Sequence, residues 1–189
     1  MFVFANDHGH SPMLHAVCGG RWLAPPPLPD VDVVTALARV DDRRWLVAGR
    51  GREGGGWLGV YEPLSFRVDR LPTSSPTFLA AAGLPELGVG VACGLGGSVV
   101  WFDGRRLVQA TALGESVPLS AASFDGDGRV WCASNGAIFC ASHVGDPEWR
   151  VAWSDARFQA PFGSLHADDG RVLAMSVDGG VVEGRLDGA

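Results

Sequence analysis

The chain has 189 residues, 47% of them apolar, so it is long enough to bury the core of one domain. Its net charge of −6, with no basic stripe, argues against a nucleic-acid backbone as the main partner. No apolar run approaches the roughly 20 residues that a membrane-spanning helix needs. No signal sequence precedes the first strand-like stretch, so we expect a cytoplasmic protein with no membrane partner.

An alanine within a strand-like apolar stretch recurs five times along the chain. The intervals are 43, 44, 41 and 41 residues, and the alanines are Ala5, Ala48, Ala92, Ala133 and Ala174. A period of this length implies stacked units that bury their faces against each other. Each period holds several short strand candidates and no convincing helix, which predicts an all-β fold, a β-propeller of about five blades. The repeats of this single domain (1–189) are 1–30, 31–73, 74–115, 116–158 and 159–189.

The first repeat holds three strand candidates and the densest group of potential metal ligands. Residues 2–7, 13–19 and 21–26 match the second, third and fourth strands of a full repeat. His8 and His10 form an H-x-H pair that could offer two imidazoles to a zinc or copper ion, with Asp7 or His15 completing the site. We favour the alternative, a solvated loop, because no second cluster supplies further ligands.

The second repeat contains the longest of the loops that join a second strand to a third. Its strand candidates are residues 32–40, 43–50, 57–62 and 66–71. Two arginines beside an exposed tryptophan could grip a carboxylate, a phosphate or an acidic peptide. Because long loops often carry function, we choose Arg50, Arg52, Glu53 and Trp57 as candidate partner-binding residues. The alternative is a surface loop without a partner.

The third and fourth repeats show the four-stranded pattern most clearly. Their strand candidates are residues 77–84, 87–94, 98–104, 106–113, 118–125, 129–134, 137–142 and 148–154. The Asn-Gly pair at 135–136 is the signal of a two-residue hairpin. Such a turn places Cys132 opposite Phe139 and Trp131 opposite Cys140.

Most of the seven tryptophans fall within strand candidates, where we expect them to pack between blades rather than to stack on sugars. Alternation in the strand 148–154 predicts that Trp149, Val151 and Trp153 share one face. Positions that we expect to be buried are Phe4, Val47, Val91, Trp131 and Leu173.

The last repeat has strand candidates at 162–168, 171–177 and 180–186 and lacks a fourth strand, as the first repeat lacks a first strand. We favour a five-bladed ring closed within the chain. The alternative is that these are consecutive blades of a larger or split propeller. Because bare sheet edges recruit other strands, we expect the terminal blades to pair with each other or with a strand of another chain.

The four cysteines stand one per strand beside apolar residues: Cys18, Cys93, Cys132 and Cys140. We interpret them as buried free thiols, which fits a reducing cytoplasm. Acidic residues gather in the turns between first and second strands, as Asp41/Asp42, Asp125/Asp127 and Asp168/Asp169. Aspartate hydrogen-bonds its own backbone in such turns, so we expect turn residues rather than catalytic carboxylates.

The phrase DGRVW (127–131), followed by NGAIF (135–139), resembles the repeat of two-component-regulator propellers. A weaker copy is DGRV (169–172) with GGVV (179–182), while DRRW (42–45) lacks the turn glycine. The resemblance implies a β-propeller that serves as a sensing or protein-interaction module, extracytoplasmic in that family. It carries over no catalytic residue and no cofactor.

The sequence contains no convergent catalytic set, so a non-enzymatic binding module with a protein partner is the leading hypothesis. A propeller lectin is the second, and it requires the same Trp or Asn in corresponding loops of several blades. A metal-dependent hydrolase or lyase is the third. It requires acidic or histidine side chains in an axial channel, and His166 is the one obvious candidate.

Overall fold

The computed structural model of the protein describes residues 2–7, 12–23, 28, 30–109, 113, 117–168 and 170–185. These residues form five antiparallel sheets of three or four strands, and the helical content is one short 3-10 turn (Leu95–Gly97). The all-β expectation is therefore confirmed. None of the described residues forms a helix long and apolar enough to cross a membrane.

The strands follow one another within each sheet in chain order. The first sheet contains β1 (Phe2–Asp7), β2 (Pro12–Cys18) and β3 (Arg21–Leu23). The second contains β4 (Val31–Arg39), β5 (Trp45–Gly51), β6 (Gly56–Glu62) and β7 (Arg67–Leu71). The third contains β8 (Phe78–Leu84), β9 (Val89–Gly94), β10 (Val99–Phe102) and β11 (Leu107–Gln109). The fourth contains β12 (Ala121–Phe124), β13 (Val130–Ser134), β14 (Ala137–Ala141) and β15 (Trp149–Ser154). The fifth contains β16 (Phe162–Asp168), β17 (Arg171–Ser176) and β18 (Val181–Arg185).

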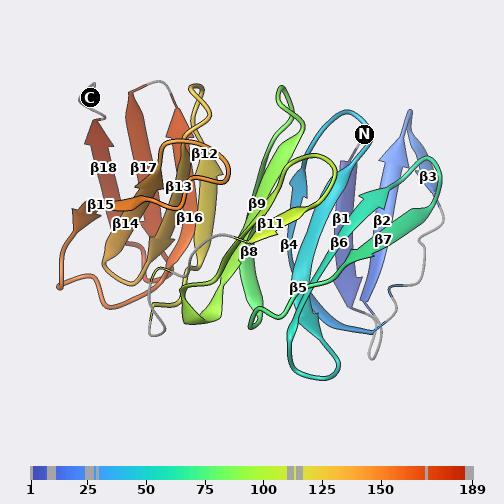
Figure 1. Ribbon diagram of the computed structural model, residues 1–189, viewed down its shortest axis with the longest axis horizontal. Helices are drawn as coiled ribbons and strands as arrows, with labels where there is room; N and C mark the ends of the chain where they lie inside the picture. Colours follow the sequence, from blue (N-terminus) through green and yellow to red (C-terminus); the bar gives the residue numbers. More distant parts are fainter. Residues whose placement is uncertain are drawn as a thin grey trace.

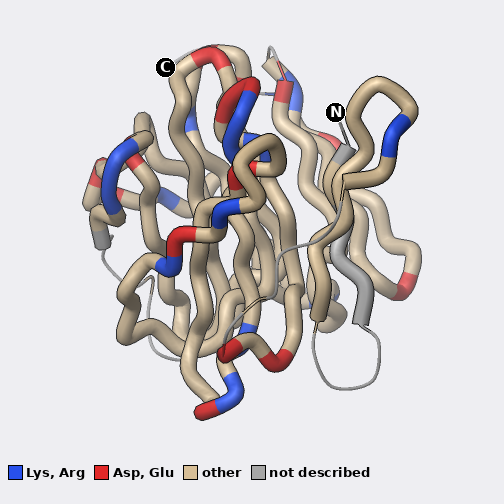
Figure 2. Tube along the Cα trace, turned by 90° about the vertical axis from the view of Figure 1, so that its right-hand side faces the viewer, with Lys and Arg blue, Asp and Glu red and all other residues tan. Residues whose placement is uncertain are grey.

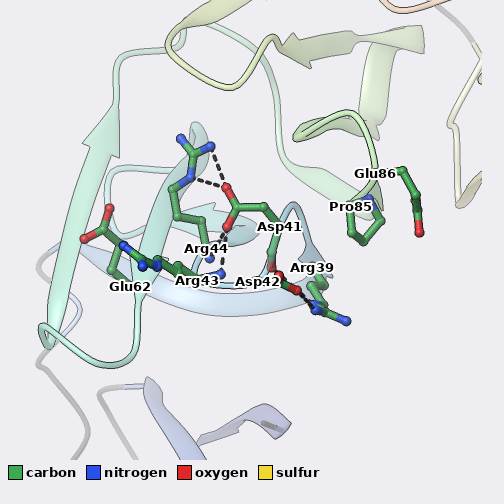
Figure 3. Close-up of a pocket in the computed structure, with 8 residues that line it drawn as sticks. All are labelled: Arg39, Asp41, Asp42, Arg43, Arg44, Glu62, Pro85 and Glu86. Carbon is green, nitrogen blue, oxygen red and sulfur yellow. Dashed lines mark hydrogen bonds and ion pairs between the residues drawn. The ribbon is translucent and has the colours of Figure 1, made fainter.

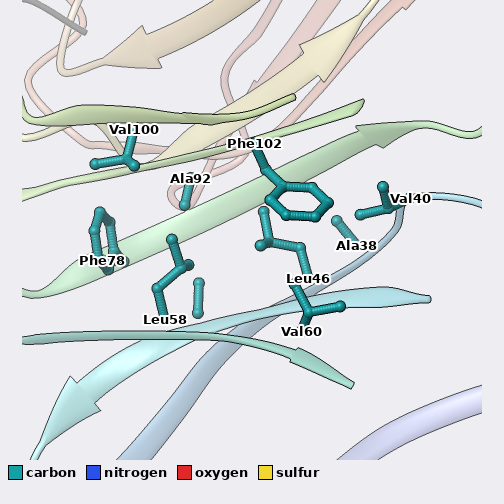
Figure 4. Close-up of a cluster of buried hydrophobic side chains, with 10 residues drawn as sticks. Ala38, Val40, Leu46, Leu58, Val60, Phe78, Ala92, Val100 and Phe102 are labelled. Carbon is teal, nitrogen blue, oxygen red and sulfur yellow. The ribbon is translucent and has the colours of Figure 1, made fainter. Parts of the chain in front are cut away.

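The sheets stand in a row and pack face to face, each against its neighbours in sequence (Figure 1). Four hydrophobic clusters fill the four junctions between consecutive sheets. At the second junction, Leu46 and Leu58 of the second sheet meet Phe78 and Phe102 of the third (Figure 4). Period-2 alternation gives each inner sheet two apolar faces, and the arrangement is β-propeller-like.

The row does not close into a ring within the described residues. The first and fifth sheets lie at opposite ends of the longest axis of the molecule, and no described strand of one packs extensively on the other (Figure 1). The favoured expectation of closure between the terminal sheets is therefore not met. Both terminal sheets have three strands, as the sequence predicts.

The predicted hairpin at Asn135-Gly136 is confirmed. Trp131 pairs with Cys140 and Cys132 pairs with Phe139, which is the register that a two-residue turn dictates. Gly136 has a φ of 65°, a left-handed conformation that favours glycine.

The prediction that Trp149, Val151 and Trp153 share one face is wrong for Trp153. A β-bulge shifts the register between β14 and β15, so that Phe139 pairs with Val151 but Ile138 pairs with Trp153. One extra residue turns every later side chain to the other face. Trp149 therefore stacks on Trp101 of the third sheet, with ring centroids 5.6 Å apart, whereas Trp153 packs toward the fifth sheet.

Val47, Val91 and Trp131 are buried as expected. Leu173 is not: 45% of its surface is exposed, because it points away from the fourth sheet and none of the described sheets covers its outer face. The side chain of Phe4 lies outside the described residues.

The recurring alanines mark the repeat period, but they do not lie on the same face of every sheet. Ala48 and Ala92 belong to one junction cluster, and Ala133 and Ala174 belong to another, so the members of each pair face each other. Small side chains at these positions let consecutive sheets approach closely.

Candidate functional site

Charged residues gather in the turns and loops at the two ends of the strands, and the strand centres carry few (Figure 2). Two hollows lie among them, at opposite ends of the second sheet. We call them the turn hollow, next to the β4–β5 turn, and the loop hollow, next to the β5–β6 loop.

The turn hollow has a volume of about 690 Å³ (Figure 3). It is lined by Arg39, Asp41, Asp42, Arg43, Arg44, Glu62, Pro85 and Glu86. The Asp41 carboxylate accepts hydrogen bonds from the backbone N–H groups of Arg43 and Arg44, both at 2.8 Å, and from Nε of Arg44 at 2.6 Å. Burial raises the pKa of Asp41, but these hydrogen bonds lower it by more, so the pKa lies below its usual range.

Much of the charge at the turn hollow is used to hold the turn together. The Arg44 guanidinium also donates to the carbonyl oxygen of Gly104 in the third sheet and lies 5.6 Å from the centre of the Phe102 ring. Arg39 pairs with Asp42. Asp41 thus acts as a turn residue, as the sequence predicts, and the site fastens two sheets to each other.

The loop hollow has a volume of about 390 Å³. It is lined by Asp30, Gly51, Arg52, Glu53, Gly55, Gly56, Arg70 and Thr73. The loop itself is well anchored: Gly51 N–H donates to the Gly55 carbonyl at 2.8 Å, and Arg52 N–H donates to the Asp30 carbonyl at 3.0 Å. Gly54 has a φ of 92°, which explains a glycine at the tip.

Two of the four predicted binding residues, Arg52 and Glu53, line the loop hollow. Arg52 Nε donates to the Val31 carbonyl at 3.3 Å, at the start of β4. Arg50 does not line the hollow and instead pairs with Asp32 through Nε at 2.8 Å.

The expectation that Trp57 is exposed beside the arginines is wrong. Trp57 is fully buried and packs with Leu14 and Tyr61 between the first and second sheets. Gly59 makes room for the indole, since a Cβ there would lie 2.6 Å from its outer ring carbon. The alternation of β6 turns Trp57 inward, so it cannot stack on a ligand in the loop hollow.

Three residues of the loop hollow lie outside the segment 50–57 and were not predicted from the sequence: Asp30, Arg70 and Thr73. Arg70 donates to Asp30 at 3.3 Å across the connection that enters the second sheet. The strand order of a repeat could have indicated them. The segments before a first strand and after a fourth strand emerge at the same end of the sheet as the β5–β6 loop.

The predicted metal ligands His8 and His10 lie outside the described residues, as does the side chain of Asp7. Across the part of the chain that the structure describes, no three His, Cys, Asp or Glu residues are grouped to hold a metal ion. His15 makes an edge-to-face contact with Trp22, with ring centroids 6.1 Å apart. His166 lies on the outward face of the fifth sheet, opposite Leu173.

The Asp125 carboxylate is buried and structural. It accepts hydrogen bonds from the backbone N–H of Asp127 at 3.1 Å, that of Arg129 at 2.9 Å, and the indole Nε1 of Trp131 at 3.0 Å. The acidic residue of this turn is therefore a turn and packing anchor, as the sequence predicts.

No protein-family model and no curated protein matches the sequence. Among solved structures, the fold is similar to the computationally designed Ika4 protein, with a TM-score of 0.64, 16% identity, and coverage of 82% of this chain and 92% of that chain. It is also similar to the computationally designed Ika8 protein, with a TM-score of 0.65, 15% identity and coverage of 97% of this chain. This chain spans 58% of the length of Ika8. At such identities the likeness concerns the fold alone, and it gives no support to the resemblance to two-component-regulator propellers.

Proposed function

We propose that the protein is a non-enzymatic binding module that presents the loop hollow to a protein partner. The observation that carries the proposal is the hollow itself, a concave surface of about 390 Å³ on an anchored loop of a rigid sheet. Rigid scaffolds with long loops commonly bind in this way.

The chemistry of the loop hollow fits a peptide segment that carries both acidic and basic side chains. Arg52 and Arg70 supply guanidinium donors, while Glu53 and Asp30 supply carboxylate acceptors. Arginine recognises carboxylates through paired N–H donors. The existing Arg70–Asp30 contact at 3.3 Å lies among exposed side chains, so a partner could replace it at little cost.

The two other hypotheses have less support. A lectin needs an aromatic platform, and the described lining of the loop hollow contains no aromatic ring because Trp57 is buried. A hydrolase or lyase needs a nucleophile with a base, or a metal, and the described lining brings no such set together.

We also propose that the five sheets are consecutive blades of a β-propeller and that the protein works in the cytoplasm. The face-to-face row of antiparallel sheets supports the first proposal. The four free cysteines, three of them buried, support the second, because disulfides are rare in a reducing compartment.

A photo-crosslinking amino acid at position 53 tests the binding site in the cell of origin. The matched control places it at Val151, an exposed residue of the fourth sheet. We expect position 53 to trap one protein that position 151 does not. With that protein purified, Arg52→Ala/Glu53→Ala should weaken binding at least tenfold, about 1.4 kcal/mol. Arg105→Ala, in the β10–β11 turn, should leave it unchanged. Equal trapping at both positions would refute the proposal.

A further inference from the structure

The outward face of the fifth sheet carries an exposed apolar patch. Leu173, Met175, Val177 and Val181 are 45%, 50%, 66% and 58% exposed. Met175 pairs directly with Val181 across β17 and β18, and directly paired residues point to the same face. Alternation along β17 puts Leu173 on the same face as Met175, so Leu173, Met175 and Val181 share one face, with His166 and Glu183 beside Leu173. Exposed apolar groups gathered in this way mark interaction surfaces.

This face is the counterpart of a face that is buried in the fourth sheet. Trp131 of β13 pairs with Ser123 on one side and Cys140 on the other. Leu173 of β17 pairs in the same manner with His166 and Glu183. Trp131 is 2% exposed because the fifth sheet covers it. Leu173 thus occupies a position built for packing on another sheet.

The outward face of the first sheet, at the other end of the row, exposes a large aromatic side chain. Leu14 and Ala16 of β2 are buried against the second sheet. The alternate residues of β2 point the other way, and Val17 pairs with Trp22, which is 68% exposed. An exposed tryptophan of this extent is unusual in a sheet that otherwise packs well.

We propose that these two surfaces bind each other between copies of the chain, with the fifth sheet of one copy packed on the first sheet of the next. The two faces lie at opposite ends of the molecule, so one copy cannot join its own ends (Figure 1). The contact continues the stacking already present at four junctions within the chain. It is a head-to-tail contact, which either closes into a ring of copies or extends as a filament.

Complementation between two variants tests the arrangement. Leu173→Glu destroys the fifth-sheet surface and Trp22→Glu destroys the first-sheet surface, each at an exposed position. Val151→Glu places the same charge on an exposed valine of the fourth sheet and serves as the control. Light scattering after size-exclusion chromatography gives the mass, and circular dichroism confirms folding.

We expect the wild type and Val151→Glu to exceed the monomer mass of 19.8 kDa and each surface variant to be a monomer. A mixture of the two surface variants should form a 1:1 complex, because each contributes its intact surface. A monomeric wild type at every concentration would overturn the proposal and assign the faces to another protein. Loss of association in one variant alone, or no complex in the mixture, would overturn the head-to-tail arrangement. Met175→Glu replaces Leu173→Glu should the latter fail to fold.

Discussion

The hydroxyl of Ser120 repeats, at the junction between the fourth and fifth sheets, the contact that Thr35 makes between the second and third. Ser120 Oγ donates to the carbonyl oxygen of Phe162 at 2.8 Å, and Thr35 Oγ1 donates to that of Phe78 at 2.9 Å. Each hydroxyl also lies near a carbonyl of its own sheet, that of Ala133 or Ala48. These bonds join sheets at two junctions that are two repeats apart.

Removing either hydroxyl should lower the free energy of unfolding. We expect about 1 kcal/mol for Ser120→Ala and for Thr35→Val, the usual net value of one hydrogen bond. Ser65→Ala is the control, because its hydroxyl bonds within its own exposed turn. Urea unfolding followed by tryptophan fluorescence measures the three values. Equal stability of Ser120→Ala and Ser65→Ala would show that the bridge is not stabilising.

Replacing Asp125 should destabilise the fourth sheet more strongly. Asp125→Ala leaves the buried Trp131 indole N–H and two part-buried backbone N–H groups without their acceptor. Each unsatisfied buried group costs about 1–3 kcal/mol. Asp125→Asn keeps one acceptor oxygen and should lose less. Thermal unfolding of the two variants compares them, and the reverse order would contradict the role of the carboxylate as acceptor.

Gly83 should not tolerate a side chain. A Cβ at this position would overlap the carbonyl oxygen of Arg39 in the second sheet. We expect Gly83→Ala to cost about 1–3 kcal/mol, as overpacking does. Gly184→Ala provides a matched comparison, since no atom lies within 4 Å of its Cβ position. That variant should be neutral or slightly stabilising, and similar melting temperatures for both would disprove the close contact.

The Asp155–Arg157 contact should make stability depend on pH at the acid end. The Arg157 guanidinium and its backbone N–H lower the pKa of Asp155 from 3.8 to about 2. A carboxyl whose pKa is lower in the folded state than in the unfolded state stabilises the fold at pH values above its unfolded-state pKa. This contribution is lost as the pH falls from 3.8 toward 2. Arg157→Gln should return the pKa toward 3.8, as carbon-13 NMR titration of the carboxyl would measure.

Strand positions were predictable because period-2 alternation and turn residues act locally. Asn135-Gly136 fixed its hairpin register without help from the rest of the fold. The face on which Trp153 lies was not predictable, because it depends on a β-bulge that no residue of the local sequence indicates. The burial of Trp57 and the exposure of Leu173 are decided by whether a neighbouring sheet is present, which is a property of the whole row.

The candidate site could be predicted only in part, for the same reason. Arg52 and Glu53 could be chosen because they stand in a long loop. Asp30 and Arg70 join them only through the folding of distant segments, so the residue pattern alone did not identify them.

A row that does not close within one chain has a further consequence for how a single copy unfolds. Each sheet is stabilised by its immediate neighbours, as in a linear array of repeats, so fraying begins at the ends and moves inward. The cysteines report this order: Cys18 stands on the first sheet, and Cys93 and Cys132 lie together at an inner junction, between the third and fourth sheets. In mild urea, Cys18 should react with a thiol reagent first, and Cys93 and Cys132 should react last. This order would show that the sheets unfold one after another rather than in a single transition.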